Sequence, residues 1–220
     1  MRTLALVSLL MSVLVNVGCT GQRSLETVRN DGDKAFFYKR FDEARADYQE
    51  VVDRDPSDWR YRVKLARMMM IMGDDARAEE LLAVVLRVRP NDDDVAGQYA
   101  EAMFKAGHRD RLISFLERRA ADSRAVADYL QLGSYAVKTG DADLAERALL
   151  TAARLDGGAT VGPQLALADL YLAAGDRAEA LRRLRMALGV DPSNEIVQQR
   201  IRALGEVPGP SFALTPDDDR

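Results

Sequence analysis

The chain has 220 residues, of which 47% are hydrophobic and 30% charged, and its formal net charge is −4. A weakly acidic chain lacks the basic surface that nucleic-acid binding requires, so nucleic acid is not an expected partner. Cys19 is the only cysteine, which excludes an intrachain disulfide framework.

The first 18 residues have the pattern of an export signal. Arg2 precedes an apolar run at residues 4–15, which is too short to span a bilayer comfortably. The following Gly18-Cys19 resembles the processing site of a bacterial lipoprotein, in which the cysteine is lipidated and becomes the new N-terminus. We expect a signal peptide over 1–18 and a lipidated tether over 19–24. A simple secretion signal and an uncleaved anchor are the alternatives.

The residue after the cysteine bears on the destination of the chain. Thr20, in place of aspartate, favours the outer membrane in the best-known lipoprotein sorting system. We therefore expect a protein of the cell envelope that is lipid-anchored at the outer membrane and faces the periplasm. The short tether would keep residue 25 within about 20 Å of the membrane.

Three columns of residues recur between residues 25 and 192 at intervals of 33 to 35 positions. A repeat of this length is typical of helical solenoids, in which each unit is a helix pair that buries its apolar face only against its neighbours. The first column is Gly32, Ala66, Ala100, Gly133 and Ala168. The second is Ala44, Ala78, Leu112, Ala145 and Ala180. The third is Tyr48, Leu82, Leu116, Leu149 and Leu184.

A turn column separates the two halves of each repeat. Glycine can take the left-handed backbone conformation at a helix end, and an aspartate after it can accept hydrogen bonds from the next helix's free N–H groups. The first repeat departs from this pattern with Lys39 and Arg40. The column is Lys39, Gly73, Gly107, Gly140 and Gly175, and aspartates follow at Asp74, Asp141 and Asp176.

These residues resemble the tetratricopeptide repeat family, most strongly at residues 68–78 and 169–180. The resemblance implies an all-α fold: a right-handed α-solenoid of helix-turn-helix repeats with a C-terminal capping helix. The repeats would cover 25–58, 59–92, 93–125, 126–160 and 161–192. The capping helix would cover 193–204, and a tail rich in proline and aspartate, 205–220, would be disordered.

The third repeat departs from the family pattern in two places. Leu112 occupies a crossing position that is alanine in the other four repeats, and Arg119 stands where the others have valine or alanine. We expect looser packing in this repeat. The arginines of the second helices, among them Arg182, Arg183 and Arg185, are expected on a solvated outer face.

No catalytic constellation stands out in the sequence. The sole histidine, His108, falls at a turn position, and no phosphate-binding glycine loop, nucleophile motif or metal-ligand spacing is present. We expect no catalytic residues, no metal site, no cofactor and no small-molecule substrate.

The resemblance places the first helix of each repeat on a concave side that binds a peptide or a helix of a partner. The leading hypothesis is a non-enzymatic, membrane-anchored scaffold that binds another envelope protein through this concave side. It would act in the assembly of an envelope machine, namely a pilus secretin, outer-membrane barrels or peptidoglycan enzymes. The alternatives are an adaptor that delivers substrates to an envelope protease or hydrolase, and an unrecognised enzyme. The predicted partner-binding residues are Arg29, Phe36, Phe37, Arg60, Arg67, Met70, Glu101, Phe104, Lys105 and Lys138.

Overall fold

The computed structural model describes residues 22–216, which contain helices and no strand. The predicted signal peptide, Cys19 and residues 217–220 lie outside this part. The α-helices are α1 (Leu25–Phe37), α2 (Phe41–Arg54), α3 (Trp59–Ile71), α4 (Asp75–Val88), α5 (Asp93–Lys105), α6 (Arg109–Ser123), α7 (Val126–Thr139), α8 (Ala142–Asp156), α9 (Gly162–Ala173), α10 (Arg177–Val190) and α11 (Glu195–Ala203).

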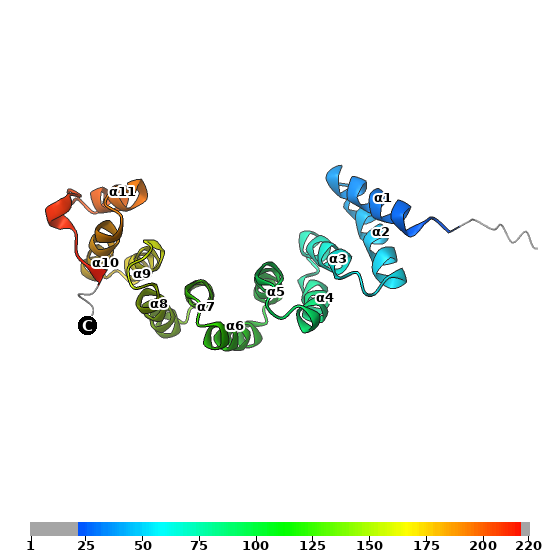
Figure 1. Cartoon of the computed structure of the whole chain (residues 1–220), viewed down its shortest axis with the longest axis horizontal. Coiled ribbons are helices and arrows are strands. Elements are labelled where there is room, and N and C mark those ends of the chain that lie inside the picture. Colours follow the sequence, from blue (N-terminus) through cyan, green and yellow to red (C-terminus); the bar gives the residue numbers. More distant parts are fainter. Residues whose placement is uncertain (1–21, 217–220) are drawn as a thin grey trace, which may run out of the picture. The chain divides into compact units, whose positions relative to one another are not determined.

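The described chain forms two compact units. The first ends at Tyr61 and holds α1, α2 and the start of α3, and the second contains the rest. In the second unit α5, α7 and α9 follow one another along the side toward which the unit curves, and α4, α6 and α8 lie along the other side (Figure 1). We call α5, α7 and α9 the inner helices. The predicted all-α solenoid of helix pairs is confirmed.

The three predicted columns are buried throughout. Their small members allow close helix crossings within a repeat. A Cβ atom on Gly32 would lie 3.0 Å from the ring of Tyr48, and one on Gly133 would lie 2.5 Å from Leu149 Cδ2. The first and third columns therefore meet each other where the two helices of a repeat cross.

The turns within the repeats follow the predicted chemistry. Gly73, Gly107, Gly140 and Gly175 all have φ near +80°. The side chains of Asp74, Asp141 and Asp176 then accept hydrogen bonds from backbone N–H groups of α4, α8 and α10, as N-caps do.

Lys39 takes the left-handed conformation as well, with φ of 58°, although it carries a side chain. The left-handed turn of the first repeat is thus made by a lysine, whereas the other four repeats use glycine, which adopts this conformation more readily.

The C-terminal segment differs from expectation. The helix α11 buries Val197 and Ile201 against α10 and α9, as a capping helix should. The following tail was expected to be disordered, but it forms a short 3₁₀ helix at Pro210–Phe212, contacts α10 through Phe212 and Leu214, and brings Pro216 beside Gly158. The Leu214 N–H donates to Arg185 O at 3.0 Å.

Two apolar contacts and one small residue explain why the tail is fixed. Phe212 and Ala213 pack on the apolar cluster that α9, α10 and α11 share. The tail crosses α10 at Gly189, where a Cβ atom would lie 2.0 Å from Leu214 O. The high content of proline and aspartate hid this docking, because it rests on two apolar side chains, one glycine and the bonds between Arg185 and the tail.

Among residues 22–216, no helix has the length and apolar character needed to cross a membrane.

Candidate functional site

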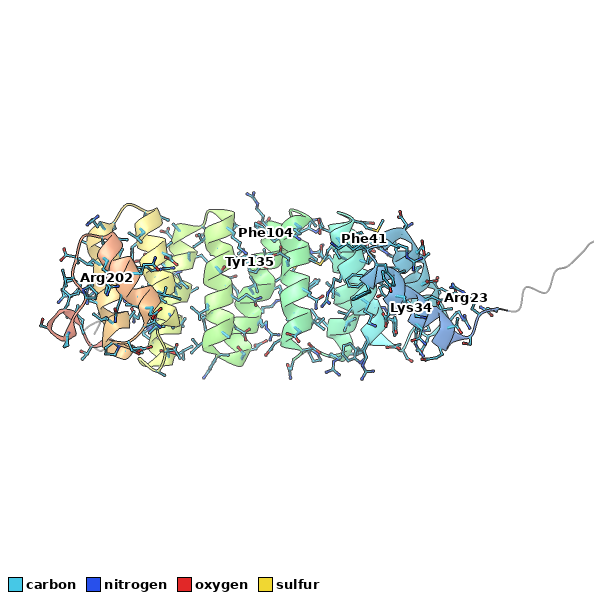
Figure 2. The ribbon with its side chains drawn as sticks, turned by 90° about the horizontal axis from the view of Figure 1, so that it is seen from above. Arg23, Lys34, Phe41, Phe104, Tyr135 and Arg202 are labelled. Carbon is cyan, nitrogen blue, oxygen red and sulfur yellow. The ribbon has the colours of Figure 1, made fainter. Side chains whose placement is uncertain are left out.

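A cluster of aromatic and cationic side chains lies on the inner helices α5 and α7. The rings of Phe104 and Tyr135 have centroids 5.6 Å apart and lie side by side on this face (Figure 2). Lys138 Nζ sits 4.5 Å from the centroid of the Tyr135 ring and 5.6 Å from that of Phe104. A cation held over two rings joins neighbouring repeats and leaves its charge at the surface.

Glu101 completes this cluster from α5. Its carboxylate accepts a hydrogen bond from the Tyr135 hydroxyl at 2.9 Å and lies 3.5 Å from Lys105 Nζ. Burial and this carboxylate together raise the pKa of Tyr135 well above its usual value. The hydroxyl therefore remains a donor even in alkaline solution. Lys105 and Lys138 supply exposed positive charge.

The structure brings together four residues that the sequence had assigned to partner binding, namely Glu101, Phe104, Lys105 and Lys138. We call these four and Tyr135 the inner cluster. Tyr135 was missed because it belongs to a buried register position, shared with Met68 and Leu170, that is typical of core residues. The signal that could have found it is that a tyrosine hydroxyl there needs a polar partner.

The remaining predicted residues of the second unit lie on α3. Arg67 is exposed and Met70 is half-buried. Farther along the inner helices, Val137 of α7 and Leu172 of α9 are exposed apolar side chains. They occupy the same register position as Met70 and Phe104, so the second unit carries one apolar residue per repeat near the turn end of its first helices.

In the first unit the predicted residues have mixed roles. Arg29 donates to the carboxylates of Asp55 and Asp58 at 2.9 Å each, and its guanidinium lies 5.4 Å from the centroid of the Tyr61 ring. Its charge is therefore used inside the unit.

The other predicted residues of this unit are more accessible. Arg60 is exposed and stacks on its neighbour Trp59 at 5.0 Å. Phe36 and Phe37 lie at the end of α1, where Phe36 is half-buried and Phe37 is exposed.

A cleft of about 1160 Å³ opens between the C-terminal ends of α4 and α6 and the first turns of α5 and α7. Tyr99 and Phe115 meet edge to face in its wall at 5.0 Å. Sequence analysis did not predict this cleft. It borders the helix pair α5 and α6, at whose crossing Leu112 replaces the alanine of the other repeats. Cleft residues also include Leu86, Arg87, Asp93, Arg118, Arg119, Asp122, Asp128 and Gln131.

Arg119 stands at the edge of the cleft in place of the apolar residue of other repeats. Its Nε donates to Asp128 at 2.9 Å, and its other nitrogens reach Asp93 and the carbonyl oxygen of Pro90. One half-buried arginine thus connects α6 to the starts of both α5 and α7, which compensates for the lost apolar packing.

The expectation of a solvated outer face is wrong for Arg183. Its side chain is buried on α10, where Nε donates to Glu179 at 2.9 Å and the guanidinium lies 5.8 Å from the centroid of the Tyr171 ring. The register shows the reason, since the equivalent residues in the other repeats are Asp47, Leu81, Phe115 and Ala148, and all but Phe115 are buried. Arg185 is half-buried beneath the docked tail.

Between residues 22 and 216, no group of three or more His, Cys, Asp or Glu side chains is arranged to hold a metal ion.

Comparison with known proteins supports the reading of the repeats. Residues 38–100 match a family model described as tetratricopeptide repeat. A search of curated protein sequences finds no match.

Solved structures share the fold. A crystal structure of MamA protein is 22% identical, with a TM-score of 0.58 over 76% of this chain and 92% of that one. A thermophilic tetratricopeptide repeat protein of Thermus thermophilus is 23% identical, with a TM-score of 0.52 over 82% and 98%. YrrB, described as a tetratricopeptide repeat protein with an unusual peptide-binding site, is 15% identical, with a TM-score of 0.52 over 81% and 92%. At these identities the likeness establishes the fold alone.

Proposed function

We propose that this chain, which contains tetratricopeptide repeats, is a non-enzymatic scaffold of the cell envelope that binds a segment of another protein along its inner helices. A lipid on Cys19 would hold it at the outer membrane. The observation that carries the binding role is the inner cluster, where the half-buried Phe104 packs on the buried Tyr135 and offers apolar surface, and Lys105 and Lys138 offer charge. The peptide-binding site ascribed to YrrB shows that the fold can serve this purpose.

The chemistry of the inner helices defines the kind of segment that fits. Val137 and Leu172 are exposed apolar side chains, and Arg67, Lys105 and Lys138 are exposed cations on the same helices or on α3. A partner segment with apolar residues at regular spacing and acidic residues between them would complement both features. Envelope assembly proteins with such segments are the proposed partners.

The test is photo-crosslinking in intact cells followed by mass spectrometry of the captured partner. A photo-reactive residue in place of Val137 should capture it, and the same residue in place of Arg147, exposed on the outer helix α8, should not. The double change Lys105→Glu with Lys138→Glu should abolish capture. Arg147→Glu with Arg154→Glu reverses two exposed charges on α8 and should leave it intact. Capture from position 147 but not 137 would place the partner on the outer side and contradict the proposal.

The lipid anchor has its own test. Cys19→Ser should leave the chain without lipid, with a different mature mass and a shift out of the membrane fraction. The same mass and partition for both chains would remove the anchor from the proposal and leave the binding role standing.

A further inference from the structure

The turn between α1 and α2 carries an unusual density of aromatic rings. Phe37 and Tyr38 are 77% and 66% exposed, and their rings meet edge to face at 5.2 Å. Phe36 and Phe41 are half-buried beneath them, with ring centroids 6.4 Å apart. Two adjacent aromatic rings exposed at the tip of a turn form a contiguous apolar patch. Patches of this kind on a folded chain often mark an interaction surface.

Cationic residues flank the consecutive rings of residues 36–38 on both sides. Lys34, Lys39 and Arg40 are all exposed. Arg40 lies 5.9 Å from the centroid of the Tyr38 ring and pairs with Glu43 at 2.7 Å, which leaves the two lysines as the main source of positive charge. We call residues 34–41 the aromatic turn.

Lys39 occupies a position that the other four repeats give to glycine. Its φ of 58° lies in the region where side chains are disfavoured. Since glycine would make this turn with less strain, folding of the repeat does not explain the lysine. The lysine is explained instead by the positive charge that it places at the tip of the aromatic turn.

Three consecutive backbone N–H groups at the tip of the aromatic turn are bonded within it. The N–H of Tyr38 donates to Lys34 O at 3.0 Å, that of Lys39 to Phe36 O at 2.9 Å, and that of Arg40 to Ala35 O at 2.8 Å. These three donors would stay paired in a medium poor in water.

We propose that the aromatic turn docks into the interface of a bilayer that contains anionic phospholipid. Phe37 and Tyr38 would lie at the head-group level, where aromatic rings are favoured, and Lys34 and Lys39 would lie beside lipid phosphates, because basic side chains near an anionic leaflet are attracted to it. The tip protrudes as a turn, which suits insertion into a lipid surface better than capture of a ligand, since ligand sites are concave. This contact is separate from a lipid on Cys19 and does not depend on it.

The position of the aromatic turn complements the predicted tether. Arg23 precedes α1 and is held by Asp47 at 2.6 Å and Glu50 at 2.8 Å, whereas Phe41 lies beyond the far end of α1 (Figure 2). A helix of 13 residues separates the two, which corresponds to about 20 Å. A second contact at this distance from the tether would fix the orientation of the first unit on the membrane, which a single flexible attachment cannot do.

The experiment places a fluorescent reporter in the full chain, reconstituted in vesicles of phosphatidylethanolamine and phosphatidylglycerol with brominated acyl chains. Trp59→Phe removes the only native tryptophan. Phe37→Trp then reports contact with lipid, and Val207→Trp, exposed in the C-terminal tail, is the matched control. We expect several-fold stronger quenching by brominated lipid for Phe37→Trp than for Val207→Trp. Lys34→Glu with Lys39→Glu should reduce it several-fold, and replacing phosphatidylglycerol with phosphatidylcholine should weaken it.

Further measurements separate this proposal from the others. Helical circular dichroism checks each variant, and Lys39→Gly, which removes the charge and also the strain, should weaken quenching without loss of fold. Equal quenching at positions 37 and 207 in chains that float with the vesicles would overturn the proposal and leave the lipid anchor intact. A photo-reactive residue at position 37 that labels a protein and no phospholipid in cells would also overturn it, because the aromatic turn would then be a protein-binding surface.

Discussion

Leu149 closes over Gly133 so tightly that a Cβ atom on the glycine would lie 2.5 Å from Leu149 Cδ2. Gly133→Ala should therefore force α7 and α8 apart and lower the free energy of unfolding by about 1 to 3 kcal/mol. Thermal or urea unfolding measures this change.

Gly97 provides the matched control, because it is also inside a helix, α5, but a Cβ there would meet only Gln131 Nε2 at 3.8 Å. Gly97→Ala should stabilise the chain by about 0.5 to 1 kcal/mol, since alanine is the better helix residue. Equal effects of the two changes would show that the crossing of α7 and α8 is not as close as described.

The docked tail should respond to a single methyl group. In Gly189→Ala the new Cβ would lie 2.0 Å from Leu214 O, which is too close for both atoms to keep their positions. We expect the tail to leave α10 and the Leu214 amide to exchange its hydrogen much faster, while the helix itself remains. Unchanged protection of that amide would mean that the tail is not held across Gly189.

Arg119 should contribute more to stability than its neighbour. Arg119→Leu removes the bond to Asp128, whose half-buried carboxylate then loses its arginine partner, and we expect a loss of about 1.5 to 3 kcal/mol. Arg118→Leu removes an exposed side chain whose Nε bonds only to Ser114 O within its own helix, and it should change stability by less than about 0.5 kcal/mol. Urea denaturation of both variants makes the comparison, and a larger effect at 118 would be contrary to the structure.

Alkaline pH should weaken the fold through Tyr171. Burial and a hydrogen bond to Glu146 at 2.5 Å raise its pKa from 10.0 to about 12. The folded chain then holds a proton that the unfolded chain loses near pH 10, so the contribution of this group is complete below pH 10 and disappears as the pH rises through about 12.

Ultraviolet titration of the tyrosinate band detects this shift when it is compared with Tyr171→Phe, which lacks the group. Glu146→Gln should bring the pKa back toward its ordinary value, because it removes the negative acceptor. A midpoint near 10 for Tyr171 in the native chain would contradict the burial and bonding described.

Residues that recur in every repeat could be placed correctly from the sequence. Residues that depart from the repeat pattern could not. The columns that contain Gly133 and Leu149 could be read because every repeat places the same kind of residue at the same crossing. Arg119 and Arg183 could not be placed by residue type, since a charged side chain normally faces solvent. Arg119 is half-buried because Asp128 at the start of α7 accepts its hydrogen bond, a contact between two helices that no local pattern records. Arg183 is buried at a mostly apolar register position, where it pairs with Glu179 one turn earlier in the same helix.

In the candidate site, too, some residues could be placed from the sequence and others could not. Helical spacing grouped Glu101, Phe104, Lys105 and Lys138 on one side of α5 and α7, because residues three and four apart share a face. It did not include Tyr135, whose ring lies in the core and whose hydroxyl donates to Glu101. Helical spacing also assigned Arg29 to partner contact. In the structure Arg29 forms ion pairs with Asp55 and Asp58, which lie between α2 and α3.

The segment that crosses α10 has a consequence for assembly. A stack of similar helix pairs ends in a surface shaped to receive one more pair, so an open end invites a second molecule to continue the array, and head-to-tail contacts of this kind grow into filaments. Here α11 covers the apolar side of the last pair and Phe212 and Ala213 cover the seam beside it. The end of the stack formed by α9, α10 and α11 is thereby closed to polymerisation, so that crowded molecules can remain separate units.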